Sequence, residues 1–529
     1  MTSTARARGA LSTMPRSTAL RLAATALLAG LAATACGTGA ADDPANAGQT
    51  SQAPQPTDID TGATVDVRLV LEPTSLDIAD TAGAALDQIL LDNVYQGLLT
   101  RDENNKVEPS LATSYHQSTD GLTYTFHLAK NATFHDGSKV TAADAVWSLR
   151  QVTAAGSKNP DAAALASVKS VSATDDHTVV VTLKHRDTGF TWGLTGRAGI
   201  VFRKGTDFAS LSGKENGTGP FRLSTWKRGS SITFVRDDAY WGKKAKVAKV
   251  VLHYIKDGNA ANNAQQTGQT DIETAADATL LQPFSDTGKY TVLRGDTTDK
   301  FTLAFNNASG PTKDVRVRRA IRRAIDNAGL VKTLGGAAKL VGGPVPATDP
   351  GYENLTAVDA YDPASAKKLL KEAGYGSGLK LTAQIPNIYP TEIGDYLASE
   401  LKQVGIRLTV RQVEFQTWLD TVYTKHHYQL SLVDHAEARD LNNFANSAYY
   451  YGYDNADVQK WYAAAQTATG DADRDALLRK AARQVSEDAA ADWLYVSQTL
   501  TVVRAGVTGV PRNFTSNRYD LANLAVAKK

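Results

Sequence analysis

The chain has 529 residues, of which 42% are hydrophobic and 21% are charged; this globular composition excludes a mainly disordered or fibrous protein. Because one hydrophobic core stops growing at roughly 250–300 residues, we expect more than one domain. Lysine and arginine number 57 against 55 acidic residues, so the net charge of +2 offers no basic excess for binding nucleic-acid phosphates.

Residues 1–35 have the features of a bacterial signal peptide. Arginines without any acidic residue precede an uncharged run from Leu22 to Ala35, which is shorter than the roughly 20 residues of a membrane span. Cys36 follows as the only cysteine, which excludes a disulfide-stapled fold. The small residues before it are similar to a bacterial lipobox, so we expect Cys36 to carry a lipid. The alternative is a plain signal peptide cut near Ala35.

Residues 36–62 are polar and rich in alanine, proline, glutamine and threonine, a composition that predicts a flexible linker. Strand patterns follow in the body: apolar and polar residues alternate over 122–128, and shorter apolar runs occupy 179–183 and 232–235. Between the first two, Thr141 and Asp144 have the spacing of a capping box and predict the start of a helix.

A helix is predicted over residues 314–328 because apolar residues recur on one side. Its arginines gather on the other side, which predicts a solvated helix face; a phosphate site is the alternative. These arginines are Arg318, Arg319, Arg322 and Arg323.

Clear start and stop signals mark three later elements. Asp362 before a proline predicts a helix start, and Gly374 its end. Gly405 stops a second helix and is followed by an alternating strand at 406–410, a unit typical of α/β proteins. Residues 471–488 form a further amphipathic helix.

The sequence lacks the motifs of the common hydrolases, P-loop proteins and metal sites. His426 and His427 are adjacent, so their rings diverge in a strand or a helix and cannot easily share a metal. We therefore expect no metal, no cofactor and no catalytic residues.

Short motifs run in order from Pro73 almost to the end of the chain, and together they identify a family. In their order and spacing the chain resembles the solute-binding proteins of ABC importers, family 5, which includes oligopeptide-, dipeptide- and nickel-binding proteins. The motifs are Pro73-Thr74-Ser75-Leu76-Asp77, Tyr95-Gln96-Gly97-Leu98, Phe134-His135-Asp136-Gly137, Gly217-Thr218-Gly219-Pro220-Phe221, Tyr240-Trp241-Gly242 and Tyr361-Asp362-Pro363.

The resemblance implies an α/β, two-lobed fold like that of type II periplasmic binding proteins, with mixed sheets flanked by helices. Lobe I is expected over 63–305, with an inserted subdomain at about 81–205. Lobe II is expected over 306–490, and residues 491–529 return to lobe I. Solute is expected to be trapped in the cleft when the lobes close about a hinge.

In peptide-binding members an acidic residue of the second lobe pairs with the amino group of the ligand. The resemblance and the spacing back from Phe444 place Glu437 at that position, with Asp434 second. His435, Arg439 and Asp440 belong to the same segment and are further candidates. The alternative is a surface loop whose charges are solvated.

Dipeptide-selective members also hold the ligand carboxylate with an arginine before the helix that ends at Gly405. Residues 384–400 contain neither arginine nor lysine, which favours longer peptides or another solute. Asn387 and Tyr389 are candidates for weaker polar contacts. Trp418 is a candidate pocket residue, with core packing as the alternative.

We therefore expect a non-enzymatic, extracytoplasmic lipoprotein, anchored to the outer face of a bacterial cell membrane, that captures short peptides and delivers them to an ABC permease served by a cytoplasmic ATPase. We expect a monomer without nucleic-acid partners. The alternatives are the same receptor role for a nickel chelate, haem, or an opine- or sugar-like solute, and, more remotely, a secreted hydrolase.

Overall fold

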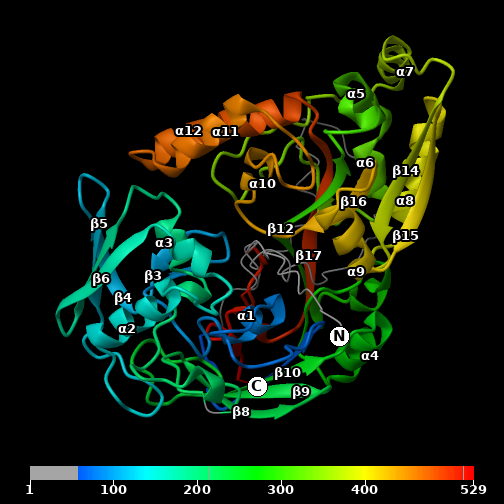
Figure 1. The fold of residues 1–529 in the computed structure, drawn as a ribbon. Coiled ribbons are helices and arrows are strands. Elements are labelled where there is room, and N and C mark those ends of the chain that lie inside the picture. The colour runs from blue at the N-terminus through cyan, green and yellow to red at the C-terminus, as the bar shows by residue number, and fades with distance from the viewer. Residues whose placement is uncertain (1–56, 214, 516–517, 529) are drawn as a thin grey trace, which may run out of the picture.

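A computed structural model describes residues 57–213, 215–515 and 518–528, so the predicted signal peptide and Cys36 lie outside the described residues. Three large hydrophobic cores organise the fold (Figure 1). The N-terminal core gathers side chains between residues 65 and 293 and again between 503 and 524. The inserted core lies within residues 98–201, and the C-terminal core within 301–496.

One mixed sheet of 11 strands passes through both the N-terminal and the C-terminal core. Its central strands β12 and β17 pair antiparallel, with a register shift between Asp296 and Lys300. In spatial order the strands are β15 (Ile406–Val413), β14 (Leu379–Pro386), β16 (Leu430–His435), β12 (Tyr290–Phe305), β17 (Ala491–Arg504), β11 (Ile272–Glu273), β1 (Thr64–Leu69), β10 (Lys249–Tyr254), β9 (Ser231–Arg236) and β8 (Phe221–Lys227), with β13 (Ala338–Lys339) paired to β17.

The inserted core lies to one side of this sheet and is built on an antiparallel sheet of its own (Figure 1). The predicted strand at 122–128 is β5, and the predicted capping box of Thr141 and Asp144 begins α2. The elements are β2 (Leu99–Arg101), β3 (Val107–Pro109), β4 (Ala112–Gln117), β5 (Thr123–Leu128), α2 (Ala142–Thr153), β6 (Val168–Asp175), β7 (Thr178–Leu183) and α3 (Phe190–Gly193).

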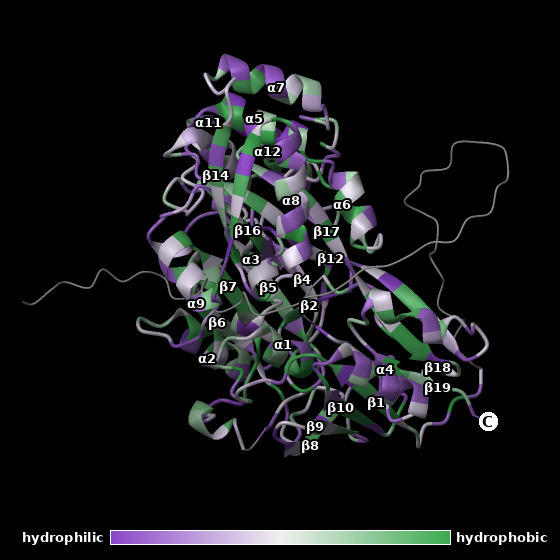
Figure 2. Cartoon of the chain, turned by 90° about the vertical axis from the view of Figure 1, so that its right-hand side faces the viewer, coloured by the Kyte–Doolittle hydropathy of each residue, from purple (hydrophilic) through white to green (hydrophobic). Residues whose placement is uncertain are grey.

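Helices flank the large sheet. Hydrophilic residues lie on their outer sides, for example on α7 in Figure 2. Over the described part of the chain, none of these helices is both long and apolar enough to cross a membrane. The helices are α1 (Ala84–Leu90), α4 (Gly258–Thr267), α5 (Val315–Ala324), α6 (Asn327–Thr333), α7 (Pro363–Glu372), α8 (Thr391–Gln403), α9 (Phe415–Trp418), α10 (Asn442–Ala445), α11 (Ala456–Gln466) and α12 (Asp471–Glu487). Two short strands, β18 (Val507–Thr508) and β19 (Ala525–Val526), pair near the C-terminus.

The predicted start and stop signals of the later helices are confirmed. Asp362 caps α7 by accepting a hydrogen bond from the backbone N–H of Ser365, and Gly374 follows with a φ of +90°. Gly405 has a φ of +88° between α8 and β15, a conformation that glycine adopts without strain. Local chemistry was therefore sufficient to place these ends.

The predicted helix at 314–328 is not continuous, because the helix ends at Ala324 and a second one begins at Asn327. Ile325 is extended, with φ −103° and ψ 119°, and Asp326 caps a new helix by accepting from the backbone N–H of Gly329. The aspartate supplies the break, since its side chain satisfies an N–H that a helix start leaves unpaired. Two short helices, α5 and α6, therefore replace the single predicted one.

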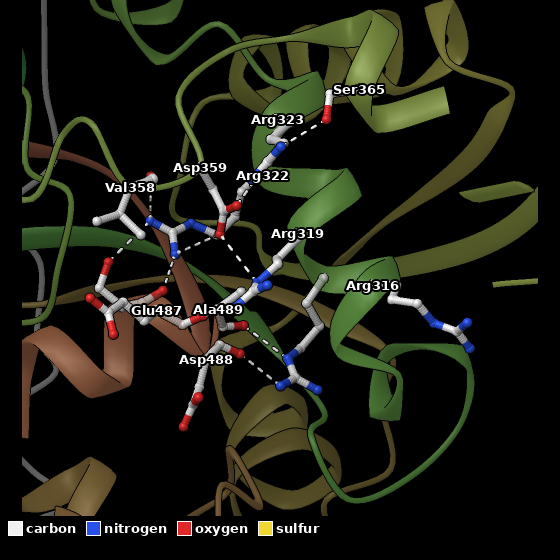
Figure 3. A network of polar contacts seen from close by, with 12 residues as sticks. Arg316, Arg319, Arg322, Arg323, Val358, Asp359, Ser365, Glu487, Asp488 and Ala489 are labelled. Atoms are coloured by element: carbon white, nitrogen blue, oxygen red, sulfur yellow. Dashed lines mark hydrogen bonds and ion pairs between the residues drawn. The ribbon is translucent and has the colours of Figure 1, made fainter. Parts of the chain in front are cut away.

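The prediction of a solvated arginine face on this helix is also wrong, because Arg318 and Arg322 are buried. Arg318 donates from Nε to the carbonyl of Ala489 at 2.9 Å and from Nη2 to that of Asp488 at 2.7 Å. Arg322 donates to the carbonyl of Ser486 and, as Figure 3 shows, to that of Val358 at 3.2 Å. Asp488 and Ala489 follow the last residue of α12, so their carbonyls have no helical N–H partner, and the guanidinium of Arg318 takes its place. The same bonds occupy the donors that a phosphate site would need.

Candidate functional site

A cleft lies where the N-terminal and C-terminal cores meet along β12 and β17. It holds about 1490 Å³ of space, open solvent included. Its lining comes from both cores and is mostly apolar. The N-terminal part supplies Val70, Leu71, Ala84, Gln88, Arg512 and Phe514, and the C-terminal part supplies Asp299, Phe301, Pro390, Ile393, Ala436 and Tyr495.

Aromatic rings form one wall of the cleft. Phe301 stacks on Tyr495 with ring centroids 4.7 Å apart, and it meets Tyr389 edge-on at 5.4 Å. The hydroxyl of Tyr389 accepts a hydrogen bond from the backbone N–H of Asp434 at 3.0 Å. This places the predicted residues Tyr389 and Asp434 beside the aromatic wall.

Asp434 is a buried carboxylate beside the aromatic wall whose hydrogen bonding is incomplete. It stands opposite Phe301 in the pairing of β16 with β12, so both side chains lie on the cleft face. The residue is only 6% exposed, and its Oδ1 is buried without a hydrogen-bond partner. Burial, followed by the charge of Asp299, raises the pKa of Asp434 well above its usual range. A cation is what this position lacks.

Lys300 is a buried cation nearby, 2% exposed, but its ammonium group is already engaged. It lies 3.3 Å from a carboxylate oxygen of Asp440 and donates to the carbonyls of Thr298 and Glu437 at 3.0 Å each. Burial raises the pKa of Asp440 to about 7, although Lys300 acts in the opposite direction. The predicted residues Glu437 and Asp440 thus meet at Lys300, Glu437 through its main chain.

Arg439, the next predicted residue, reaches across to the inserted core. Its guanidinium carbon lies 3.7 Å from the ring centroid of Trp192 in α3, and that of Arg101 lies 3.9 Å from the same ring system. Both guanidinium groups therefore make cation–π contacts with the same indole. Thr188 adds a second bridge, donating from N–H and hydroxyl to the carbonyls of residues 466 and 465.

None of the predicted site residues belongs to the cleft lining itself, and the remaining ones lie further from it. His435 is buried between the hydroxyls of Tyr450 and Tyr451, at 3.0 and 2.7 Å from Nε2, and burial lowers its pKa to about 3. Trp418 is fully buried and donates to Ser431, which fits the core alternative. Asn387 is exposed and donates its amide to a glutamate side chain at 2.7 Å.

Sequence reasoning missed Asp299, Lys300 and Trp192. Asp299 and Lys300 end a polar stretch, Thr-Thr-Asp-Lys, that gives no strand signal, and a lone tryptophan such as Trp192 is more often packing than function. Over the described ranges, no three His, Cys, Asp or Glu side chains are grouped to hold a metal ion.

Comparisons with known proteins identify the family of this chain. The family model described as bacterial extracellular solute-binding proteins, family 5 middle region, matches residues 106–457. The glutathione-binding protein GsiB of Pectobacterium atrosepticum is 28% identical over 352 residues, covering 64% of this chain and 67% of that protein.

Solved structures agree in fold. The binding protein DppA of Helicobacter pylori, in complex with peptide STSA, has a TM-score of 0.73 at 24% identity and covers 88% of this chain and 99% of that one. NikZ of Campylobacter jejuni, in complex with Ni(L-His), has a TM-score of 0.71 at 20% identity, with coverage of 87% and 99%. The chain belongs to the family 5 solute-binding proteins, which are substrate-binding proteins of ABC importers and not enzymes.

Proposed function

We propose that this family 5 protein captures short peptides outside the cytoplasm and passes them to a membrane permease. The observation that carries the proposal is the buried, unpartnered Oδ1 of Asp434 on the cleft face, next to Asp299. Burying a carboxylate is costly unless a cation pairs with it. The N-terminal ammonium of a peptide is a cation of the right size, and the aromatic wall gives the first side chain an apolar surface.

We propose Asp434 as the main amine ligand, with Glu437 in a supporting role. Lys300 cannot neutralise both Asp434 and Asp440, because its ammonium group is already paired with Asp440. A positively charged solute therefore supplies at Asp434 the cation that the protein itself does not provide there. The relatives named above bind glutathione, a peptide and a nickel chelate, so a chelate or another amine-bearing solute is the second candidate.

We further propose that the N-terminal and inserted cores form one lobe and the C-terminal core the other, joined by β12 and β17. The stack of Arg439 on Trp192 and the bonds of Thr188 are contacts between these lobes. Solute that touches both lobes stabilises the closed form and so shifts the equilibrium toward it. Opening at the permease would then release the solute unchanged.

The anchor is proposed from the sequence alone: a signal peptide ending at residue 35, a lipid on Cys36 and a linker to residue 62. Such a lipid would hold a monomeric receptor at the outer face of the membrane, close to its permease. The intact mass of detergent-extracted protein would show the lipid, and Cys36→Ala should release the protein from membranes. Light scattering after size-exclusion chromatography would give the oligomeric state.

Calorimetry with trialanine and N-acetyl-trialanine tests the peptide role. Wild-type protein should bind trialanine and lose binding when the amine is acetylated, because the acetylated peptide has no ammonium group for Asp434. Asp434→Asn should weaken trialanine binding, whereas Asp395→Asn, an exposed residue of α8, should not. Absence of binding to any short peptide, with a chelate found by native mass spectrometry, would replace the proposal with the second candidate.

A further inference from the structure

A cationic side chain lines the other side of the cleft, where the apolar lining gives no reason for a charge. Arg512 belongs to the C-terminal segment after β18 and lies in the cleft lining. Over the described ranges, no carboxylate lies within ion-pair distance of its guanidinium, and neither Nη atom has a hydrogen bond. Arg512 thus faces a largely apolar cleft without an anionic partner, and it can bind an anionic group that a solute brings.

The chain fixes Arg512 in place while leaving the end of its side chain unused. Its backbone N–H donates to Glu103 at 2.6 Å, and its Nε donates to the carbonyl of Arg294 at 2.9 Å. A side chain at Gly295 would place its Cβ 1.6 Å from the carbonyl oxygen of Arg512, so glycine permits this close approach to β12. A guanidinium held through Nε keeps both Nη groups available for a carboxylate, the geometry that arginine offers best.

The separation along β12 sets the length of solute that reaches both ends of the cleft. Arg512 lies beside Gly295, and Phe301, which stands opposite Asp434, lies six positions further along the strand. At about 3.3 Å per residue, less where the register shifts, this corresponds to roughly 15–20 Å. An extended peptide of about five or six residues covers that distance between its amino and carboxyl ends.

We infer that Arg512 binds the C-terminal carboxylate of a zwitterionic penta- or hexapeptide whose amine lies at Asp434. This inference rests on the proposed peptide role and adds the class and length of the solute. It also supplies a carboxylate partner in a chain whose residues 384–400 contain no arginine or lysine.

Calorimetry on the folded protein with penta-alanine and penta-alanine amide tests the inference without any mutation. Wild-type protein should bind the free acid about 10-fold or more tightly than the amide, the range expected for hydrogen bonds to a charged group. Arg512→Gln should reduce the affinity for the acid to that for the amide and leave the amide unaffected. Arg411→Gln, an exposed arginine of β15, is the matched control and should change neither.

The outcomes separate this inference from the proposed function. Equal binding of acid and amide by the wild type overturns the role of Arg512 and leaves the peptide receptor standing. Binding of neither overturns both. In a series from di- to octa-alanine, the tightest binding should fall at five or six residues, and a series that tightens steadily with length would overturn the length assignment.

Discussion

Glu273 provides a test of the buried electrostatics that needs no solute. The residue ends β11 in the large sheet, is 0% exposed, and neither carboxylate oxygen has a hydrogen-bond partner. Arg68 is close enough to interact, but its guanidinium donates to main-chain carbonyls, including those of Ile255 and Ala275. Burial raises the pKa of Glu273 to about 7, against the opposing effect of Arg68. The folded protein therefore holds this carboxyl more readily as the neutral acid.

The raised pKa fixes the sign and size of the effect on stability. The ordinary value is 4.5, and the gap to about 7 corresponds to about 3 kcal/mol. Below pH 4.5 the side chain is protonated in both states and costs nothing. As pH rises, the unfolded chain loses its proton first, so stability falls until pH passes about 7. Roughly 2–3 kcal/mol should be lost between pH 5 and pH 8 through this residue alone.

Urea unfolding of wild type and Glu273→Gln at pH 5 and pH 8 measures this loss. The amide mimics the neutral acid at every pH, so the variant should gain about 2–3 kcal/mol relative to wild type between the two pH values. Glu392→Gln, at an exposed site in the first turn of α8, should show no such gain. A stability difference between Glu273→Gln and wild type that stays constant with pH would refute the reasoning.

Three further predictions concern binding, closure and folding. Asp434→Asn should weaken binding of an amine-bearing peptide by roughly 30-fold or more without destabilising the solute-free protein, as calorimetry and thermal unfolding would show. Trp192→Ala should shift the lobes toward the open form by roughly twofold to thirtyfold, measured from spin-label distances, whereas Trp226→Ala, whose arginine partner lies on the same lobe, should not. Arg322→Met should cost about 3 kcal/mol or more in urea unfolding, because it strands buried carbonyls and carboxylates, while exposed Arg316→Met should cost little.

The parts of the fold that were predictable are those set by a few neighbouring residues. The capping box at Thr141 and the glycine at 405 act within one helical turn, and both are found as expected. The break after Ala324 was hidden because the apolar spacing continues through it. The burial of Arg318 was hidden because an arginine is ordinarily solvated. Two of its partners are the carbonyls of Asp488 and Ala489, just after α12 and about 170 positions away in sequence (171 for Ala489). No local sequence pattern predicts these contacts.

The candidate site was harder to predict than the fold, again because it depends on contacts between distant parts of the sequence. The family resemblance pointed to residues 433–441, yet which carboxylate faces the cleft depends on the register of β16 against β12. Asp434 stands opposite Phe301 on the cleft face, and His435 stands opposite Lys300 with its ring packed between tyrosines. Neighbouring residues of a strand face opposite sides, so a slip of one position would turn the carboxylate away from the cleft face and present the imidazole. The sequence determines that register only through the whole packed sheet, which is why sequence reasoning could propose the segment but could not rank its members.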